Sequence, residues 1–299
     1  MQNNRKMERL TGTGVALVTP FNENGSIDFQ SLEKLVESVI KGGIDYLVCL
    51  GTTGETPTLS KQERKDVVAA IASANSGRLP MALGIGGNNT AALKEEFNQT
   101  DLSQFTAVLS SSPNYNKPNQ EGIYQHYKAL AENTDADIIL YNVPGRTGSN
   151  IAPETTLRLA NDFKNIIAIK EASPNFVQST EVLKSKPADF KVISGDDEFG
   201  LPMTLAGGNG TISVIAQGLP ELYSQMIRCG LERKVDEAYQ LHYKLMDITR
   251  SIYVEGNPTG IKCLLAHKGI CKPFTRLPLV PASSNLSQKI RSLLDVVEL

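Results

Sequence analysis

The sequence predicts an α/β fold, a (β/α)₈ TIM barrel with a C-terminal helical extension, on the strength of three observations. Short apolar runs alternate with helix-length segments, which is typical of parallel strands joined by helical crossovers. Eight such units occupy about 225 residues, close to the usual barrel size of roughly 250 residues. The alternative, a doubly wound open sheet, usually carries a glycine-rich nucleotide loop after its first strand, whereas TPFNENG (19–25) follows here.

The eight strands are expected at the short apolar runs, because these have the length of buried strands. In chain order the runs are GVALVTP (14–20), IDYLVCL (44–50), MALGI (81–85), TAVLS (106–110), DIILYNV (137–143), NIIAIK (165–170), FKVISG (190–195) and GTISVI (210–215).

Helices are expected between these runs. Asp28 can cap the first helix, which ends at Gly42, and Ser60 with Glu63 forms a capping box before the second. Later helices are expected near 90–99, 120–133, 153–161, 175–185 and 197–206, and the chain is helical from about 219 to a last helix near 286–299. We therefore divide the chain into a catalytic barrel (1–225) and a helical extension (226–299) packed on it.

Composition excludes several classes of function. A net charge of -2 with no long basic run argues against nucleic-acid or anionic-membrane partners. The charged start MQNNRKMERL (1–10) lacks the apolar core of a signal peptide, and no apolar run is long enough to span a bilayer. These features predict a cytoplasmic protein.

The four cysteines and three histidines are scattered without metal-ligand spacing. We expect the cysteines to be small buried side chains rather than disulfide partners, and His126 to lie on the surface of a polar helix. The sequence thus predicts no zinc site.

Lys170 ends the apolar run NIIAIK, so the predicted strand carries an ammonium group to the rim of the barrel, where active sites of this fold lie. Desolvation favours the neutral amine, which can attack a ketone or aldehyde to form a Schiff base. Two alternatives remain open at this point. Lys170 could extend to solvent at the rim, or it could pair with Glu171.

Other polar residues follow predicted strands. GTTGE (51–55) places two hydroxyls between glycines, where successive N–H groups can hold a carboxylate. Tyr141 could relay protons, and the guanidinium fork of Arg146 suits a substrate carboxylate. GGNG (207–210) could hold an anion. Ordinary turns or solvated loop residues are the alternative interpretation of each.

The chain resembles the dihydrodipicolinate synthase family of pyruvate-dependent Schiff-base aldolases from about residue 11 to its end. The resemblance rests on GVALVTPF (14–21), GTTGE (51–55), YNVPGRTG (141–148), IAIKEAS (167–173), SGDD (194–197) and NPTGIK (257–262). It implies a lyase that condenses pyruvate with L-aspartate 4-semialdehyde at the start of the diaminopimelate and lysine pathway, without a cofactor. It also implies a homo-oligomer, at least a dimer and commonly a tetramer.

The resemblance implies four catalytic residues. Lys170 would form the Schiff base with pyruvate, and Tyr141 would donate and accept protons. Thr52 and Tyr115 would complete a proton relay, with Tyr115 supplied by a neighbouring subunit.

Four further residues would bind substrate. Thr53 would hold the pyruvate carboxylate through its hydroxyl and backbone N–H, and the backbone of Ile212 would contact pyruvate. Arg146 would receive the carboxylate of the semialdehyde, and Gly195 would shape the pocket.

Three other functions remain as alternatives. A 2-keto-3-deoxy-sugar or sialic acid aldolase would use the same lysine, although sialic acid lyases typically lack an arginine at the position of Arg146. A non-catalytic keto-acid-binding barrel would not need Lys170 and Tyr141. A phosphate-sugar isomerase would need a general base over the barrel mouth, and no matching glutamate motif is found.

Feedback by L-lysine is expected to be weak or absent. Family members that lysine inhibits supply a glutamate and a tyrosine to the effector, and Ala92 and Asn114 stand at those positions here. Lys61 and Arg64 replace common histidines, while Asn88 is kept, so added positive charge should disfavour an ammonium-bearing ligand.

Overall fold

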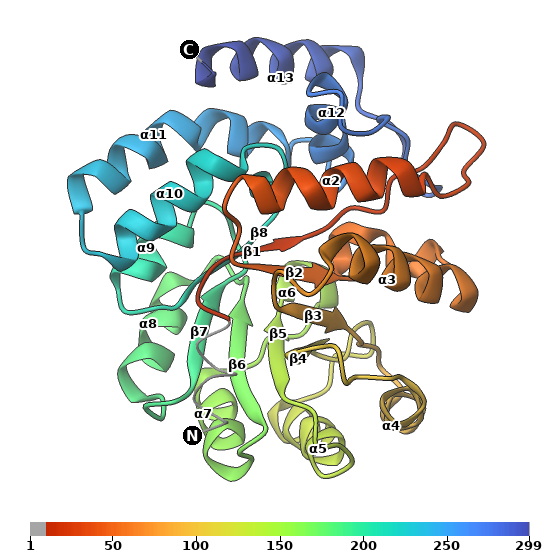
Figure 1. Ribbon diagram of the computed structural model, residues 1–299. Helices are drawn as coiled ribbons and strands as arrows, with labels where there is room; N and C mark the ends of the chain where they lie inside the picture. The colour runs from red at the N-terminus through yellow and green to blue at the C-terminus, as the bar shows by residue number, and fades with distance from the viewer. Residues whose placement is uncertain (1–9, 299) are drawn as a thin grey trace.

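The computed structural model describes residues 10–298 and contains a closed barrel of eight parallel strands, which confirms the predicted fold (Figure 1). Neighbours in the barrel follow chain order, and β8 pairs with β1 to close it. The strands are β1 (Gly12–Ala16), β2 (Tyr46–Cys49), β3 (Met81–Gly84), β4 (Ala107–Ser111), β5 (Ile138–Asn142), β6 (Ile166–Glu171), β7 (Lys191–Ser194) and β8 (Gly210–Ser213). Each lies within, or one residue beyond or before, a predicted run except β1, which starts two residues early.

Helices surround the barrel and connect its strands (Figure 1). The α-helices of the barrel are α2 (Phe29–Lys41), α3 (Lys61–Asn75), α4 (Thr90–Gln99), α5 (Gln120–Ala131), α6 (Pro144–Thr147), α7 (Pro153–Asp162), α8 (Phe176–Ser185) and α9 (Gly200–Leu205). Short 3₁₀ helices are η1 (Thr52–Gly54), η2 (Thr56–Thr58) and η3 (Ile215–Gln217).

Helix termini follow the capping signals in the sequence. The Asp28 side chain accepts from the backbone N–H of Ser31 at the start of α2, and Gly42 caps its end. Ser60 and Glu63 form the expected capping box before α3. The predicted helix at 197–206 begins later, at Gly200, because the carboxylate of Asp196 holds the following residues in a turn by accepting from two backbone N–H groups.

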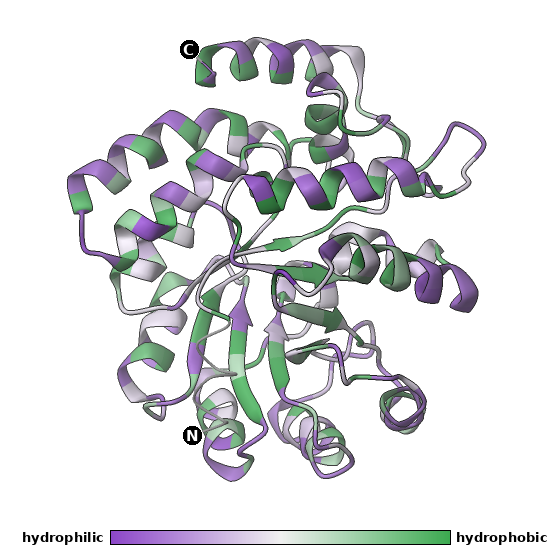
Figure 2. Ribbon diagram, viewed as in Figure 1, coloured by the Kyte–Doolittle hydropathy of each residue, from purple (hydrophilic) through white to green (hydrophobic). Residues whose placement is uncertain are grey.

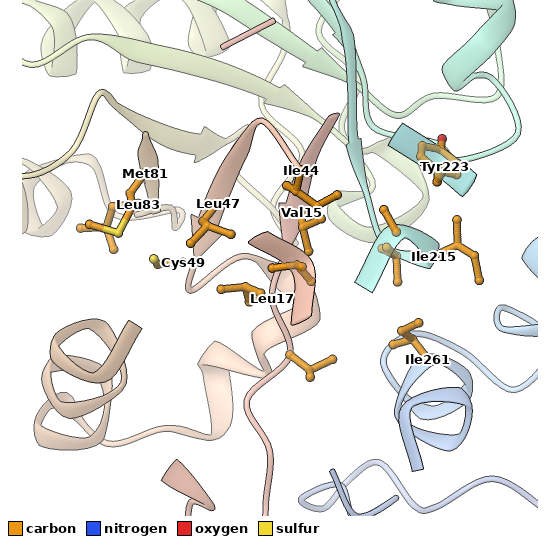
Figure 3. Close-up of a cluster of buried hydrophobic side chains, with 14 of the residues drawn as sticks. Val15, Leu17, Ile44, Leu47, Cys49, Met81, Leu83, Ile215, Tyr223 and Ile261 are labelled. Atoms are coloured by element: carbon orange, nitrogen blue, oxygen red, sulfur yellow. The ribbon is translucent and has the colours of Figure 1, made fainter. Parts of the chain in front are cut away.

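Apolar side chains form two layers, one on each side of the strands. Figure 2 shows strands that are largely hydrophobic and helices that alternate between hydrophobic and hydrophilic faces. Between strands and helices lies a large outer cluster, part of which Figure 3 shows around Val15, Leu47 and Leu83. The inner cluster fills the barrel and consists of Leu10, Ala16, Tyr46, Val48, Ala82, Ala107, Leu109, Ile139, Tyr141, Val143, Ile167, Ala168, Ile193 and Ile212.

The C-terminal helices lie on one side of the barrel, and the last of them contacts the preceding helices rather than the strands (Figure 1). They are α10 (Pro220–Leu231), α11 (Val235–Ser251), α12 (Thr259–His267) and α13 (Ser284–Val297). The proposed division at residues 225 and 226 falls inside α10 and stays a prediction. Residues 1–9, which hold most of the segment inspected for a signal peptide, lie outside the described residues. Among residues 10–298, no helix has the length and apolarity needed to cross a membrane.

The burial of His126 in α5 corrects one expectation from the sequence. The four cysteines are buried, as expected. His126 was expected on the surface but is only 4% exposed. Its Nδ1 lies 2.8 Å from the hydroxyl of Thr90, and its Nε2 has no hydrogen-bond partner in the described part of the chain. The polar neighbours of His126 in the sequence lie on the opposite face of α5. His126 is buried because it lies on the apolar face of this helix.

His126 should make stability fall at acidic pH. Burial lowers the pKa of His126 to about 4, whereas an unfolded histidine takes up a proton near its ordinary pKa of about 6.5. Between these values the unfolded state binds more protons, so the free energy of unfolding decreases as pH falls from about 6.5 to about 4. Denaturant titrations of the wild type and His126→Asn, which keeps a partner for Thr90 but does not titrate, should show a shallower decrease in the variant. Equal slopes would contradict the assignment.

Candidate active site

A β-bulge aims Lys170 into the barrel. The pairing of β5 with β6 shifts register between Ile138, which faces Ile166, and Ile139, which faces Ala168. The extra residue is Ile167, and both Ile167 and Ala168 therefore belong to the inner cluster. Strict alternation then resumes, so that Lys170 points inward and Glu171 outward. The apolar run in the sequence carries no sign of this bulge.

Lys170 lies beneath the ring of Tyr141. The two residues are paired across β5 and β6, and the lysine Nζ is 4.4 Å from the centroid of the tyrosine ring. Lys170 is only 5% exposed, so it does not extend to solvent at the rim. Within residues 10–298 no carboxylate forms an ion pair with it, because Glu171 faces the other way and accepts hydrogen bonds from Asn142 and Gln178. Both structural alternatives for Lys170 are therefore wrong.

Because Gly195 has no side chain, the side chain of Lys170 can occupy the space beside it. Gly195 follows β7, the strand next to β6, and its N–H donates to the Glu171 carbonyl at 2.7 Å. A Cβ at position 195 would lie 2.9 Å from Cε of Lys170 and 2.7 Å from Cβ of Ala172, closer than side chains pack. Ile212, 1% exposed, continues the same wall from β8. The predicted shaping role of Gly195 thus has a steric basis.

Thr52 and Thr53 stand across the barrel from Lys170, because β2 and β6 are opposite in a ring of eight strands. Thr53 is 2% exposed, and its Oγ1 accepts from Nδ2 of Asn257 at 3.0 Å. That contact leaves the hydroxyl proton of Thr53 free to be donated. The backbone N–H groups of Thr52 and Thr53 donate to no group in the described part of the chain. The turn thus offers the donors that a carboxylate needs.

GGNG (207–210) does not belong to this face of the barrel. It precedes β8 and therefore lies at the opposite end, where Asn209 bonds to Gly12 and Val192 through its backbone. Gly210 has a φ of 102°, and a Cβ there would lie 1.9 Å from the carbonyl oxygen of Gly12. The segment is a tight turn outside the candidate active site, and its role as an anion site stays a prediction.

Arg146 lies in the short helix α6 and Tyr115 in the segment between β4 and α5, and these two segments contact each other at the mouth. The N–H of Tyr115 donates to the Thr147 carbonyl at 3.2 Å. The Arg146 guanidinium is exposed and forms no ion pair within the described residues, so it is available to a ligand carboxylate. The Tyr115 side chain is 89% exposed, which is unusual for an aromatic ring next to a candidate site.

A buried ion pair beneath the Thr52–Thr53 turn was not anticipated. Glu55 and Lys262, from α12, contact each other with side chains 1% and 0% exposed. Glu55 also accepts from the N–H of Arg276 at 2.9 Å, and Lys262 donates to the carbonyl of Phe274. Burial lowers the pKa of Lys262, and the Glu55 carboxylate opposes that shift by stabilising the ammonium form.

This ion pair ties the C-terminal helices to the turn that holds Thr53. Glu55 has a φ of 53°, in the left-handed region that a side chain occupies only when its surroundings hold it there. With the Asn257–Thr53 bond, two contacts from the extension fix the turn. The sequence signal existed, since Glu55 and Lys262 end the motifs GTTGE and NPTGIK, but only the fold pairs them.

The positions compared with known lysine sites lie in loops after β3 and β4 and in the first turns of α3 and α4. Asn88 and Ala92 are exposed around the start of α4, Lys61 is exposed at the start of α3, and Asn114 is exposed in the loop before α5. Weak lysine feedback stays a prediction. Within residues 10–298, no three His, Cys, Asp or Glu side chains are arranged to hold a metal ion.

Removing Lys262 should destabilise the fold strongly. Lys262→Met would leave the Glu55 carboxylate buried without its cation, a change that typically costs about 3–5 kcal/mol. Lys268→Met is the matched control, since it breaks the more exposed pair with Glu298 and should cost less than about 1 kcal/mol. The measurement is the free energy of unfolding from denaturant titration. Similar losses in the two variants would contradict the role given to the buried pair.

Comparison with known proteins agrees with this geometry. The model of the dihydrodipicolinate synthetase family matches residues 9–297. A protein of Flavobacterium psychrophilum named 4-hydroxy-tetrahydrodipicolinate synthase is 56% identical over 284 residues, which cover 95% of this chain and 97% of that protein. The solved dihydrodipicolinate synthase of Thermotoga maritima is 38% identical with a TM-score of 0.94, over 96% of this chain and 98% of that one.

A second solved relative adds a ligand. The dihydrodipicolinate synthase of Acinetobacter baumannii, solved in complex with pyruvate, is 36% identical with a TM-score of 0.93, over 97% of this chain and 99% of that one. Family model, relatives and fold all agree over nearly the whole chain. The chain therefore belongs to the dihydrodipicolinate synthetase family.

Proposed function

We propose that this protein is a lyase that condenses pyruvate with L-aspartate 4-semialdehyde to give 4-hydroxy-tetrahydrodipicolinate, opening the diaminopimelate and lysine pathway. The observation that carries the proposal is the buried amine of Lys170, which lies under Tyr141 without a carboxylate partner in the described residues. Names of relatives at 56% and 49% identity support the substrates.

The first half of the reaction uses Lys170. Its neutral amine attacks the ketone carbon of pyruvate, water leaves, and a cationic imine forms. The face of the Tyr141 ring, 4.4 Å from Nζ, is placed to stabilise that cation, an effect worth about 0.5–2 kcal/mol. Donors of the Thr52–Thr53 turn hold the carboxylate of pyruvate. Loss of a proton from the methyl carbon then gives the enamine nucleophile.

The second half joins the two substrates. The enamine carbon attacks the aldehyde carbon of the semialdehyde, whose carboxylate rests on Arg146, and Tyr141 moves protons through Thr52 and Tyr115. The amine of the bound product then attacks the imine carbon and displaces Lys170 as the ring closes. Exposure of Tyr115 in the single chain supports its donation to a neighbouring subunit, and hence a dimer or a tetramer of two dimers. Cytoplasmic location stays a prediction.

Turnover and covalent trapping test this function together. Purified protein with pyruvate and L-aspartate 4-semialdehyde, coupled to the reductase that consumes the product, should give a pyruvate-dependent signal. Lys170→Ala should lose at least about 1,000-fold in kcat, because the covalent route disappears. Borohydride reduction with pyruvate should label Lys170 in the wild type. Labelling of a different lysine, or none, would refute the assignment.

Arg146 separates the leading function from its sibling aldolases. Arg146→Ala should raise the KM for the semialdehyde by about tenfold or more, since a charge-assisted bidentate contact is lost. Pyruvate labelling of Lys170 should be unchanged in this variant. Labelling without turnover in the wild type would instead point to a sugar-derived aldehyde, and an unlabelled, inactive wild type to a keto-acid-binding barrel.

A further inference from the structure

Directly behind the reactive pair lies a second pair of side chains on the outer face of the same strands. Asn142 and Glu171 follow Tyr141 and Lys170 in sequence and are paired with each other across β5 and β6. Nδ2 of Asn142 lies 3.0 Å from both carboxylate oxygens of Glu171. The inner pair, Tyr141 and Lys170, contains the proposed catalytic groups. The outer pair, Asn142 and Glu171, links the two strands directly through side chains.

The outer pair is buried and saturated with hydrogen bonds. Asn142 is 0% and Glu171 1% exposed. Glu171 also accepts from the backbone N–H of Ser173 at 2.7 Å and from Nε2 of Gln178 at 3.0 Å. Oδ1 of Asn142 accepts from the N–H of Ile151 at 2.9 Å. We call Asn142, Glu171 and Gln178 the register clamp.

A carboxylate in this layer is costly, which indicates a specific role. Within residues 10–298, Glu171 forms no ion pair, so its charge is balanced by neutral donors alone. Burying an aliphatic side chain between strand and helix would cost less free energy than burying a carboxylate. Apolar packing, however, tolerates sliding, whereas a carboxylate held by donors from several segments accepts only one arrangement.

The bulge at Ile167 explains why such an arrangement is needed. Because the pairing shifts by one residue between Ile138 and Ile139, the pairing before the bulge does not by itself fix the register of the segment that follows. A slip of one residue would turn the side chain of Lys170 from the barrel interior toward the helices. Hydrogen bonds at the far end of β5 and β6 oppose that slip.

We propose that Asn142 and Glu171 are positioning residues that hold Lys170 under the Tyr141 ring by fixing the β5–β6 register after the bulge. The proposal rests on the proposed function only for its kinetic readout. Neither residue touches substrate, since both face away from the barrel interior. Their effect on catalysis is therefore transmitted through the strands.

The experiment exchanges the two partners. Glu171→Gln and Asn142→Asp each place like groups opposite one another, while the double variant N142D/E171Q restores a carboxylate facing an amide. Asp45→Asn is the control, because it makes the same carboxylate-to-amide change at the other end of the barrel, where Asp45 accepts from the N–H of Thr13. For every variant we would measure kcat, KM for pyruvate, the rate of borohydride-trapped labelling of Lys170, and Tm.

Each single exchange should lower kcat and the labelling rate about tenfold or more, with KM for pyruvate within about threefold, because orientation and not binding is disturbed. The double variant should recover at least about fivefold over the worse single variant, as coupled partners do. Asp45→Asn should stay within about twofold of the wild type. Single variants that match Asp45→Asn, or a double variant that recovers nothing, would overturn the proposal.

A milder variant keeps the test decisive if the single exchanges do not fold. Gln178→Met removes one donor to Glu171 and should lower the labelling rate about threefold or more, so an unchanged rate would overturn the clamp. An unlabelled wild type would instead refute the proposed function. In that case a crystal structure of Glu171→Gln decides independently, since the clamp requires Lys170 to leave its place beneath the Tyr141 ring.

Discussion

Closure of the barrel is the constraint on which the whole site depends. Every strand is paired on both sides, so the eight carboxyl ends meet in one ring and cannot move independently. The backbone hydrogen bonds of the barrel bring together residues from β2, β5, β6, β7 and β8 that are far apart in sequence. Side chains inside the ring must then share a limited volume, which is why Gly195 stands beside the long side chain of Lys170.

The reactive group that this ring of strands encloses is the buried, unpaired amine of Lys170. Lys170 is only 5% exposed, and no carboxylate in the described residues pairs with it. The ring of Tyr141 offers weaker stabilisation from one side only. The amine is therefore held inside the barrel without an ion-pair partner and can meet a carbonyl compound that enters the mouth.

The C-terminal helices contribute to the mouth of the barrel as well as covering it. Lys262 and Asn257 reach the turn that contains Thr53, and Tyr253 donates to the buried carboxylate of Asp197, which in turn accepts from the backbone just after β8. These contacts bind the loops after β2 and β7 to the extension directly, and the segment after β8 through Asp197. Loss of the extension would therefore be expected to loosen the candidate site and not merely expose an outer surface.

The sequence by itself determined the order of strands and helices, their caps and the residue types at the strand ends, because apolar periodicity and capping are local properties. It also contained Lys170, Tyr141, Thr53 and Arg146 in recognisable motifs. Only the tertiary structure decided which way Lys170 points, since the bulge at Ile167 arises from pairing with β5. It likewise decided that GGNG lies at the opposite end and that Glu55 meets Lys262, because such contacts join residues that local sequence does not relate.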